Sequence, residues 1–501
     1  MVTNQETQVQ AVISPRSTGG QSLFDATEIN SVNVSQFRSE EGLVQQTVNR
    51  LRQANFIVHQ ISDITISFSG PLELFRTYFN AELRATEREV TESLTIPFFE
   101  AEAPTARERQ LLTTTSDTEL ANLIEGVALA EPPELFEAAV PPRLDPNPYY
   151  YLCVPDDVGL MLNANRVHRF GVTGSNIKVA MVDSGFYRHP FYNLHGYRVS
   201  SVTLGPGATS PEKDMNGHGT GEAANIFSAA PDIRLLPVKG LSDPVGSFNA
   251  AVARTPHIIT NSWGYSVDRP PNSLSPYLAT LAAAIANAVA NGITVCFSAG
   301  NGHYGFPGSM PDVISVGGVH VNYPALSLEA SNYASSFDSH FYPGRHVPDL
   351  CGLVGRNAGG APLIMLPVQP GASLDTGTND GWGRFSGTSA ASPQIAGVCA
   401  LVLERNPSLT PAKVKDVLIA SCTDVTTGQS AMGQNAGPGA DDATGAGLVN
   451  AKWAYLRAFS ATASAFFAAS TDEQQRMIQS GQMPPISEEV LDDLMEVLRS
   501  R

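Results

Sequence analysis

Apolar runs alternate with helix-like stretches through the middle of the chain. Nearly continuous apolar runs are typical of strands buried on both faces of a sheet, and they lie at 177–182, 233–238, 257–261 and 293–298. Apolar residues at helical spacing separate them, at 219–229, 246–254 and 276–290. This alternation predicts an α/β fold with a doubly wound, mainly parallel sheet. Functional side chains are then expected at the carboxyl ends of the strands.

The first 150 residues follow a different pattern. Residues 1–27 are polar and rich in Gln, Thr and Ser, which predicts a disordered N-terminus. Over 28–130, two helix-like stretches are interleaved with strand-like runs. The first strand-like run lies at 29–37. This order predicts a small α+β domain of the ferredoxin-like kind. Prolines recur over 131–150, and they predict an extended linker.

Helical signals return after the sheet pattern ends near residue 460. A capping box begins at Thr471, and a second helix start at Ser487 precedes an apolar stripe. We therefore expect a short helical tail over 461–501. Packing of this tail against the α/β domain and recruitment of a partner protein are both open at this point.

Composition narrows the functional class. Lys and Arg number 31 and Asp and Glu number 48, which makes the formal net charge −17. A protein that binds nucleic acid needs a basic surface to displace counterions from phosphates, so this function is not expected. Charged residues are only 16% of the chain and hydrophobic residues 42%, which indicates a large buried core.

The sequence predicts neither an export signal nor a membrane span. Residues 1–20 are polar and lack a basic stretch followed by an apolar one. The most apolar stretch, 278–299, is interrupted by Asn287, Asn291 and Gly292. The five cysteines form no C-x-x-C pair and are interpreted as buried, reduced thiols. On these grounds we expect a cytoplasmic protein.

Three short motifs carry candidate chemistry. AMVDSG places Asp183 after a buried strand, and NGHGT places His218 at the start of a helix. GTSAASP places Ser389 at the start of another helix, which Pro393 helps to begin. Each motif alone also fits a structural role, because Asp and Ser commonly cap turns and helices.

Together the three residues form a nucleophilic triad in the order Asp, His, Ser. A serine hydroxyl is a poor nucleophile at neutral pH, so Ser389 needs His218 as a base. The base in turn needs an anion to hold its tautomer, which is the role expected of Asp183. The motif SAGNG after a buried strand offers Asn301 as a donor to the oxyanion.

On these motifs the sequence resembles the subtilisin-like (S8) serine proteases over about 155–457. Further matching motifs are GVTG, FPG, DVISVG, NPSLTP and GAGLVNA, at 171–174, 306–308, 312–317, 406–411 and 445–451. The resemblance implies a subtilisin-like catalytic domain over 151–460, with Asp183, His218 and Ser389 as the triad and Asn301 at the oxyanion hole. It implies a peptide or protein substrate, and Ser262, Trp263 and Gly264 as the strand edge that pairs with the substrate backbone.

The same resemblance implies a role for the N-terminal domain. Residues 28–130 would be a propeptide that assists folding and inhibits the enzyme within its own chain. The enzyme would then be a zymogen that is autoprocessed when the linker is cut. No cofactor is required by this chemistry.

One residue departs from the family pattern. After HGT the family usually continues with HVAG, whereas this chain has Gly221, Glu222 and two alanines. Glu222 is either a solvated acid in the first turn of a helix or a residue that tunes His218. Related sedolisins carry Glu and Asp on one helix, but they lack the histidine motif and have Asp at the position of Asn301.

Two other functions therefore stay open beside the serine endopeptidase. One is a catalytically idle peptide-binding scaffold on a protease fold, with the C-terminal helices as its binding part. The other is a sedolisin-type acid peptidase, which would not require a neutral His218.

No metal site is assigned from the sequence. Relatives often bind structural calcium, but ligands from scattered loops cannot be recognised by spacing. His189 and His195 are interpreted as structural. The acidic residues that could take part in a calcium site are Asp349, Asp375, Asp380, Asp441 and Asp442.

Overall fold

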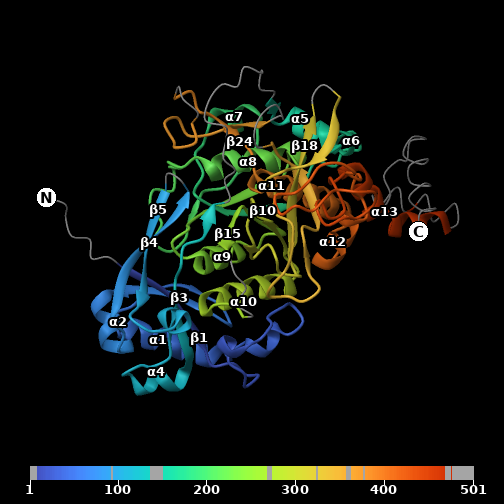
Figure 1. Ribbon diagram of the computed structural model, residues 1–501. Helices are drawn as coiled ribbons and strands as arrows, with labels where there is room; N and C mark the ends of the chain where they lie inside the picture. Colours follow the sequence, from blue (N-terminus) through green and yellow to red (C-terminus); the bar gives the residue numbers. More distant parts are fainter. Residues whose placement is uncertain are drawn as a thin grey trace.

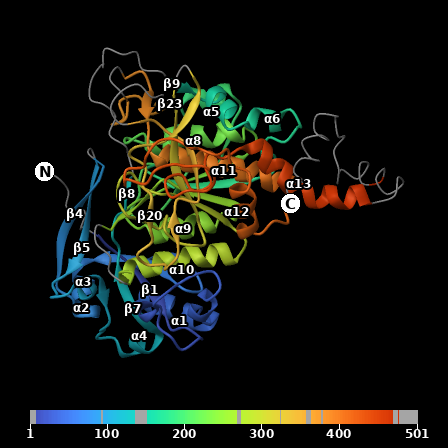
Figure 2. The ribbon, with the colours of Figure 1, turned by 45° about the vertical axis from the view of Figure 1, so that its right-hand side comes forward.

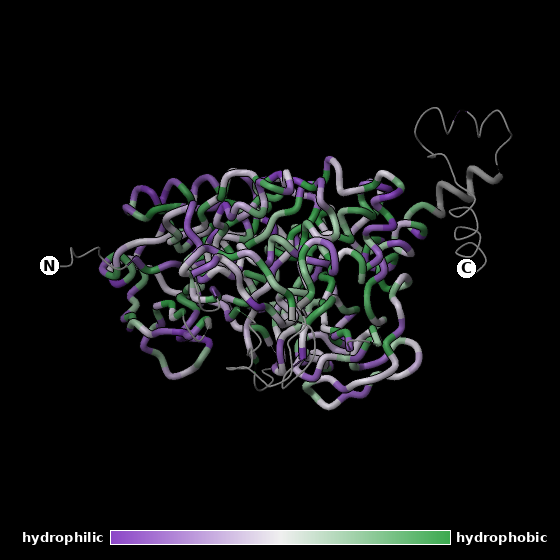
Figure 3. Tube along the Cα trace, turned by 90° about the horizontal axis from the view of Figure 1, so that it is seen from above, coloured by the Kyte–Doolittle hydropathy of each residue, from purple (hydrophilic) through white to green (hydrophobic). Residues whose placement is uncertain are grey.

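A computed structural model describes residues 8–468 and Arg476, except 92–93, 136–150, 268–272, 323–324, 357–362 and 376–378. It contains an N-terminal domain, blue to cyan in Figure 1, packed against a larger domain that runs from green to red. Viewed from above, apolar segments concentrate inside the molecule (Figure 3). Among the residues just given, no helix is long and apolar enough to cross a membrane.

The larger domain is built on a mainly parallel sheet, which confirms the predicted α/β class. Its central strands are parallel neighbours in the order β13-β10-β14-β16-β18. They are β10 (Lys178–Asp183), β13 (Arg234–Lys239), β14 (Ile258–Asn261), β16 (Thr294–Ser298) and β18 (Ile314–Asn322). At the edges lie β11 (Arg198–Val199), β12 (Thr203–Leu204), the antiparallel β19 (Ser327–Ala330) and β22 (Leu350–Leu353).

Helices cover both faces of this sheet (Figure 1). Along β10, Val179 and Met181 belong to one apolar core with α8 and α11, whereas Ala180 and Val182 belong to a second core with α9 and α10. This alternation is why the strand reads as continuously apolar. The helices are α5 (Asp156–Met161), α6 (Ala164–His168), α7 (Pro190–Leu194), α8 (His218–Ala229), α9 (Pro244–Val252), α10 (Pro276–Ala290), α11 (Thr388–Arg405), α12 (Pro411–Ile419) and α13 (Ala451–Ala468).

The N-terminal domain has the predicted α+β architecture. Its antiparallel sheet has the order β2-β3-β1-β7-β6, and its first four members with α1 and α4 give the ferredoxin-like connection. The strands are β1 (Gln8–Pro15), β2 (Ile57–Ile61), β3 (Ile66–Pro71), β4 (Leu83–Thr91), β5 (Leu94–Ala101), β6 (Leu111–Leu112) and β7 (Ile124–Leu129). The helices are η1 (Leu23–Asp25), η2 (Val34–Phe37), α1 (Glu41–Gln53), α2 (Leu72–Phe79), α3 (Ala106–Gln110) and α4 (Thr118–Leu123).

The prediction of disorder over residues 1–27 is wrong from residue 8 onward. Strand β1 lies between β3 and β7. Val9, Ala11 and Ile13 are buried in the N-terminal core, and Val12 is buried in the core shared with the larger domain. The intervening Gln residues hid this strand from a reading based on composition. The strand expected at 29–37 is also wrong, because the 3-10 helix η2 forms there.

The two domains share a continuous core along α10. Phe24, Phe37 and Val12 lie in the same apolar cluster as Tyr277 and Leu281. Figure 2 shows α10 between the N-terminal domain and the main sheet, with the β4–β5 hairpin rising along the side of the larger domain. The N-terminal domain is therefore a docked unit in this chain.

The remaining elements complete the larger domain. Short sheets pair β20 with β21 and place β23 between β24 and β9. These strands are β9 (Tyr151–Cys153), β20 (Phe337–Asp338), β21 (His346–Val347), β23 (Leu363–Pro367) and β24 (Trp382–Phe385). The helical tail predicted over 461–501, with its starts at Thr471 and Ser487, lies mostly outside the described residues. Helix α13 crosses the boundary expected at residue 460 and ends at Ala468.

Candidate active site

Asp183 and His218 meet at the carboxyl edge of the main sheet. Asp183 is the last residue of β10, and His218 is the first residue of α8. His218 Nδ1 lies 2.8 Å from Asp183 Oδ1, and both side chains are almost completely buried. Since a carboxylate only accepts, this contact holds the imidazole with its hydrogen on Nδ1, and Nε2 is left as the basic nitrogen.

The start of α8 is held close to β10 by glycines and by a buried acid. A Cβ on Gly219 would lie 2.3 Å from the carbonyl oxygen of Gly185, so only glycine allows this approach. Asp214 accepts from the backbone N–H groups of Gly217 (3.1 Å) and Thr220 (2.8 Å). Sequence reasoning missed Asp214, although an acid just before a predicted helix start is a recognisable capping signal.

Ser389 is anchored to the end of the neighbouring strand β14 by a reciprocal pair of hydrogen bonds. Its Oγ donates to the carbonyl oxygen of Ser262 (3.2 Å), and Ser262 Oγ donates to the carbonyl oxygen of Ser389 (2.9 Å). The second bond is possible because Pro393, four residues on, has no N–H for that carbonyl. Pro393 was expected to help begin this helix. It lies inside α11 instead.

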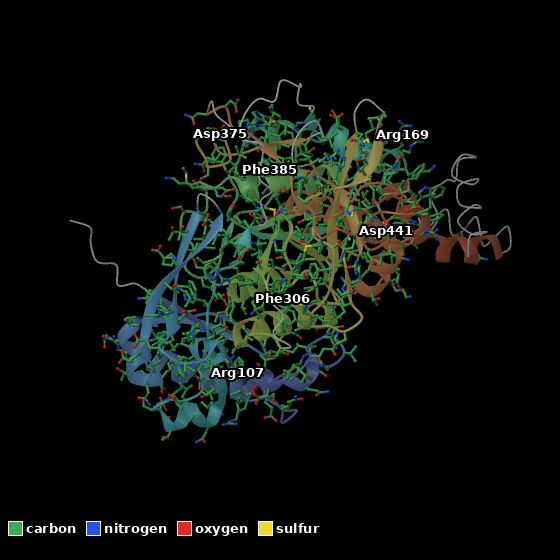
Figure 4. All side chains as sticks on the ribbon, in the orientation of Figure 1. Arg107, Arg169, Phe306, Asp375, Phe385 and Asp441 are labelled. Carbon is green, nitrogen blue, oxygen red and sulfur yellow. The ribbon has the colours of Figure 1, made fainter. Side chains whose placement is uncertain are left out.

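The two anchor points are adjacent in the sheet. Val182 and Asn261 are register partners in β10 and β14, so Asp183 and Ser262 follow neighbouring positions. Trp263 Nε1 donates to the carbonyl oxygen of Val182 (2.8 Å) and holds the two strand ends together. The structure thus brings Asp183, His218 and Ser389 to one edge, where Phe385 also lies, its ring centroid 6.3 Å from that of His218 (Figure 4).

Asn301 lies on the loop that follows β16, beside the start of α11. Its Oδ1 accepts from the backbone N–H of Thr388 (3.0 Å) and from Thr388 Oγ1 (3.1 Å). These two donors fix the orientation of the amide, with its oxygen toward the start of α11. Gly300, at φ 116°, gives the loop the turn that this placement needs.

The segment predicted to pair with substrate forms strand β15 (Trp263–Ser266). One edge of β15 pairs with β17 (Gly305–Phe306), and the other pairs with the chain's own β8 (Glu134–Leu135). Leu135 lies opposite Trp263 and Glu134 opposite Gly264. Two residues of the linker expected over 131–150 therefore form a strand on the expected substrate edge, and residues 136–150 lie outside the described part.

A partly buried ion pair lies beside this strand. Glu131 pairs with Arg88 of the β4–β5 hairpin, and its backbone carbonyl accepts from Tyr265 Oη (2.8 Å). Burial raises the pKa of Glu131, with Arg88 acting in the opposite direction. Arg88 also lies over the ring of Tyr265, 5.8 Å from its centroid. No local sequence signal links these residues, because they come from three distant segments.

Glu222 is buried, so its interpretation as a solvated acid is wrong. Its side chain is 1% exposed, and Oε1 lies 3.8 Å from His218 Nε2. The second interpretation, an acid that acts on His218, remains. The structural interpretation of His189 and His195 fits their contacts, because His189 Nδ1 accepts from the Phe191 N–H (3.1 Å) and His195 Nδ1 lies 2.9 Å from the Phe191 carbonyl.

The acidic residues considered for calcium do not converge. Asp349 is already engaged by Arg345 and by Lys415 Nζ (2.9 Å). Asp375 and Asp441 lie well apart in Figure 4. Within the described residues, no group of three or more His, Cys, Asp or Glu side chains is arranged to hold a metal ion.

Comparisons with known proteins show the family of this chain. A family model described as the subtilase family matches residues 174–447, more than half of the chain. Subtilisin of Bacillus pumilus is 30% identical over 284 residues, which cover 52% of this chain and 89% of that protein. Subtilisin E of Bacillus subtilis (strain 168) has the same identity over 284 residues, but only 64% of its length is covered.

A solved structure shows a similar fold over most of the chain. Fervidolysin from Fervidobacterium pennivorans, a keratinolytic enzyme related to subtilisin, superposes with a TM-score of 0.55 at 18% identity. The superposition covers 91% of this chain and 62% of fervidolysin, and at this identity it speaks for the fold alone. The family match and the Bacillus pumilus relative show that the chain belongs to the subtilase family.

Proposed function

We propose that this protein is a serine endopeptidase with Ser389 as nucleophile, His218 as base and Asp183 as the supporting anion. The observation that carries the proposal is the buried 2.8 Å contact between His218 Nδ1 and Asp183 Oδ1, at the edge where Ser389 is anchored to Ser262. This contact leaves Nε2 of the imidazole to take a proton. The proposed chemistry needs no cofactor, since the side chains supply nucleophile, base and anion.

Acylation would proceed in two steps, in which one proton passes from Ser389 to His218 and then to the leaving amine. The Ser389 oxygen bonds to the substrate carbonyl carbon while its proton passes to His218 Nε2. The imidazolium then gives that proton to the leaving amine, the C–N bond breaks, and an acyl-enzyme remains. Water then attacks the acyl-enzyme ester by the same two steps, with His218 first accepting and then donating the proton, and Ser389 is restored.

The oxyanion of the tetrahedral intermediate would lie between Asn301 and the start of α11. Asn301 supplies its amide nitrogen, because Thr388 holds its oxygen. The Ser389 backbone N–H, at the N-terminus of the helix, is the second donor. Preorganised donors of this kind stabilise charge that develops only in the transition state.

The substrate would bind as an extended strand along β15. The antiparallel pairing of β8 with Trp263 and Gly264 supports this binding mode. From Glu134 to Leu135 the β8 strand advances toward the Ser262 side of β15, because antiparallel strands advance in opposite directions. Residues 131–135 would therefore occupy the subsites on the amino side of the bond that is cut.

We also propose that the N-terminal domain is a propeptide that inhibits its own enzyme. The docked β8 strand, the Arg88–Glu131 pair and the shared core along α10 support this role. Autoprocessing would then cut the chain on the carboxyl side of Leu135. Mass spectrometry of the purified wild type should place the first new C-terminus within 136–150, and cuts confined to other segments would contradict this register.

The main test is Ser389→Ala. We expect this variant to lose hydrolysis of a denatured protein substrate and its own processing, while its thermal unfolding stays close to that of wild type. A fluorophosphonate should label wild type and fail to label the variant. If the variant kept its turnover, the assignment of Ser389 would be wrong; if wild type showed neither labelling nor turnover, the scaffold function would be favoured.

We propose a reducing, cytoplasmic location. All five cysteines are free, and Cys296, Cys351 and Cys399 are buried, which fits a compartment where thiols stay reduced. Subcellular fractionation with a thiol count on the native protein would test this location, and recovery in a secreted, disulfide-linked form would contradict it.

A further inference from the structure

A second carboxylate lies beside the imidazole of His218. Glu222 stands one helical turn after His218 on α8, so the two side chains lie on the same face of the helix. Its Oε1 is 3.8 Å from His218 Nε2, and its side chain is 1% exposed. Burying a carboxylate away from water is costly unless other groups stabilise it, so its position calls for a physical reason.

A buried chain of amides holds Glu222 in place. Asn225 Nδ2 donates to Glu222 Oε2 (2.9 Å), and Gln394 Nε2 of α11 donates to Asn225 Oδ1 (3.4 Å). Gln394 is fixed in turn by the backbone of Leu353, since it accepts from that N–H (2.8 Å) and donates to that carbonyl (3.0 Å). Asn225 and Gln394 are fully buried. The network links β22, α11 and α8, and it leaves Glu222 Oε1 on the His218 side.

The other titratable groups around His218 are mostly acidic or neutral. Asp183 approaches from β10 on the opposite nitrogen, and Asp214 lies in the loop before α8, bound to Thr220. Tyr192 of α7 contacts the carbonyl oxygen of Thr220, and burial keeps it neutral by raising its pKa well above the ordinary value. Lys239 of β13 is a cation beside Asp214: burial lowers its pKa, and Asp214 acts to raise it.

We propose that Glu222 is a positioning residue for the proposed hydrolysis, which places a second negative charge beside the base and makes His218 a stronger proton acceptor. The proposal rests on the proposed function. In water-poor surroundings a charge at this distance acts strongly on the imidazolium, which forms only during the reaction. A stronger base takes the serine proton more readily, but it also becomes protonated at a higher pH.

Removal of this charge should therefore have two opposite effects. In Glu222→Gln the acid limb of the pH profile of kcat/KM should move down by about one pH unit or more. The plateau of kcat/KM should fall by roughly tenfold, because the base is weaker. Glutamine keeps the shape and still accepts from Asn225, so structural damage alone would lower the plateau without moving the limb.

Glu404→Gln is the matched control. Glu404 is a partly buried acid on the neighbouring helix α11, and it accepts from the backbone of Thr173, Gly174 and Ser175 ahead of β10, away from the carboxyl edge. Its substitution should leave the acid limb in place. If Glu222→Gln fails to fold, Glu222→Leu removes the same charge and should move the limb in the same direction.

A spectroscopic readout separates this proposal from the proposed function. In a Ser389→Ala background, the His218 imidazole can be titrated by NMR with labelled histidine, and Glu222→Gln should lower its midpoint by about one unit or more. A midpoint and an acid limb that do not move would overturn the role of Glu222. A midpoint that moves, while the chain that retains Ser389 shows no peptidase activity, would support the charge coupling and overturn the proposed function.

Discussion

Two kinds of helix start occur in the larger domain, and they satisfy their backbone N–H groups differently. Helices α10 and α12 begin at Ser275 and Thr410, whose hydroxyls accept from a backbone N–H three residues on, and a proline follows each. Helices α8 and α11 begin at Gly217 and Gly387, which have positive φ and no capping side chain. The second pair carries His218 and Ser389.

The difference teaches how a helix start is kept available for chemistry. A capping side chain would occupy the place where a reacting group must lie. At α8 the N–H groups are satisfied from outside the helix, by Asp214 and by Ser184 Oγ, which accepts from Gly219. At α11 Asn301 serves Thr388 in the same way. The residues that shape the site therefore also stabilise the helices that build it.

The largest effect on stability should come from the anchor of α12, a helix with an ordinary cap. Its Lys415 and the nearby Arg345 both pair with buried Asp349. Burial acts to raise the pKa of Asp349, but the two cations hold it below its ordinary value. Asp349→Asn should lower the apparent free energy of unfolding by about 3–5 kcal/mol, because two cations lose their buried partner.

The same carboxylate predicts a pH dependence. A depressed pKa in the folded state contributes stability above the unfolded value of about 4, and this stability is lost as the pH falls further. The thermal stability of wild type should therefore decrease as the pH falls below about 4. Asp349→Asn should make this dependence of stability on pH less steep. A variant with the slope of wild type would show that other carboxylates govern acid unfolding.

Asn301→Ala should have the next largest effect, this time on the site. Loss of one oxyanion donor costs on the order of 10²–10³ in kcat. The same change removes the acceptor for the Thr388 N–H, so stability should fall by about 1 kcal/mol. Steady-state kinetics beside thermal unfolding would measure both, and an unchanged kcat would mean that another group serves the oxyanion.

Asp214→Asn tests whether α8 depends on its outside partner. Asp214 accepts from two N–H groups and from the hydroxyls of Ser184 and Thr220, and an amide has only one oxygen to accept with. We expect a loss of about 1.5–3 kcal/mol in stability together with lower kcat/KM, since His218 begins this helix. Unchanged stability would mean that water or backbone replaces these bonds.

Thr410→Ala gives the smallest effect and completes the comparison. Loss of an ordinary N-cap costs about 1 kcal/mol, and the start of α12 carries none of the proposed catalytic residues. The free energy of unfolding should fall by this amount while kcat/KM stays constant. A clear loss of activity would show that the ordinary helix starts also support the site.

Motifs in the sequence indicated more of the proposed site than of its surroundings. Asp183, His218, Ser389 and Asn301 were recognised because glycines and strand ends frame each of them in sequence. Asp214 was missed although it carries a local signal. The pairing of Arg88 with Glu131 had no signal at all, since ion pairs between distant segments leave no spacing to read.

The fold shows the same division. The strands β10, β13, β14 and β16 were predicted within one residue of their observed bounds, because burial on both faces makes them continuously apolar. Strand β1 was missed because alternating Gln residues resemble a polar tail, and only its place between β3 and β7 makes it a strand. For Glu222 the sequence left two interpretations open, because helical position alone does not show which face of the helix is covered.

Local order along the chain determined the class of sheet, the helix starts and the identity of the chemical groups, because these depend on neighbours a few residues apart. Tertiary structure alone decided that β8 lies on β15, that Glu222 is buried beside His218, and that the N-terminal segment is a central strand. Each of these depends on what a distant segment covers or pairs with, and desolvation and strand pairing are properties of the packed molecule.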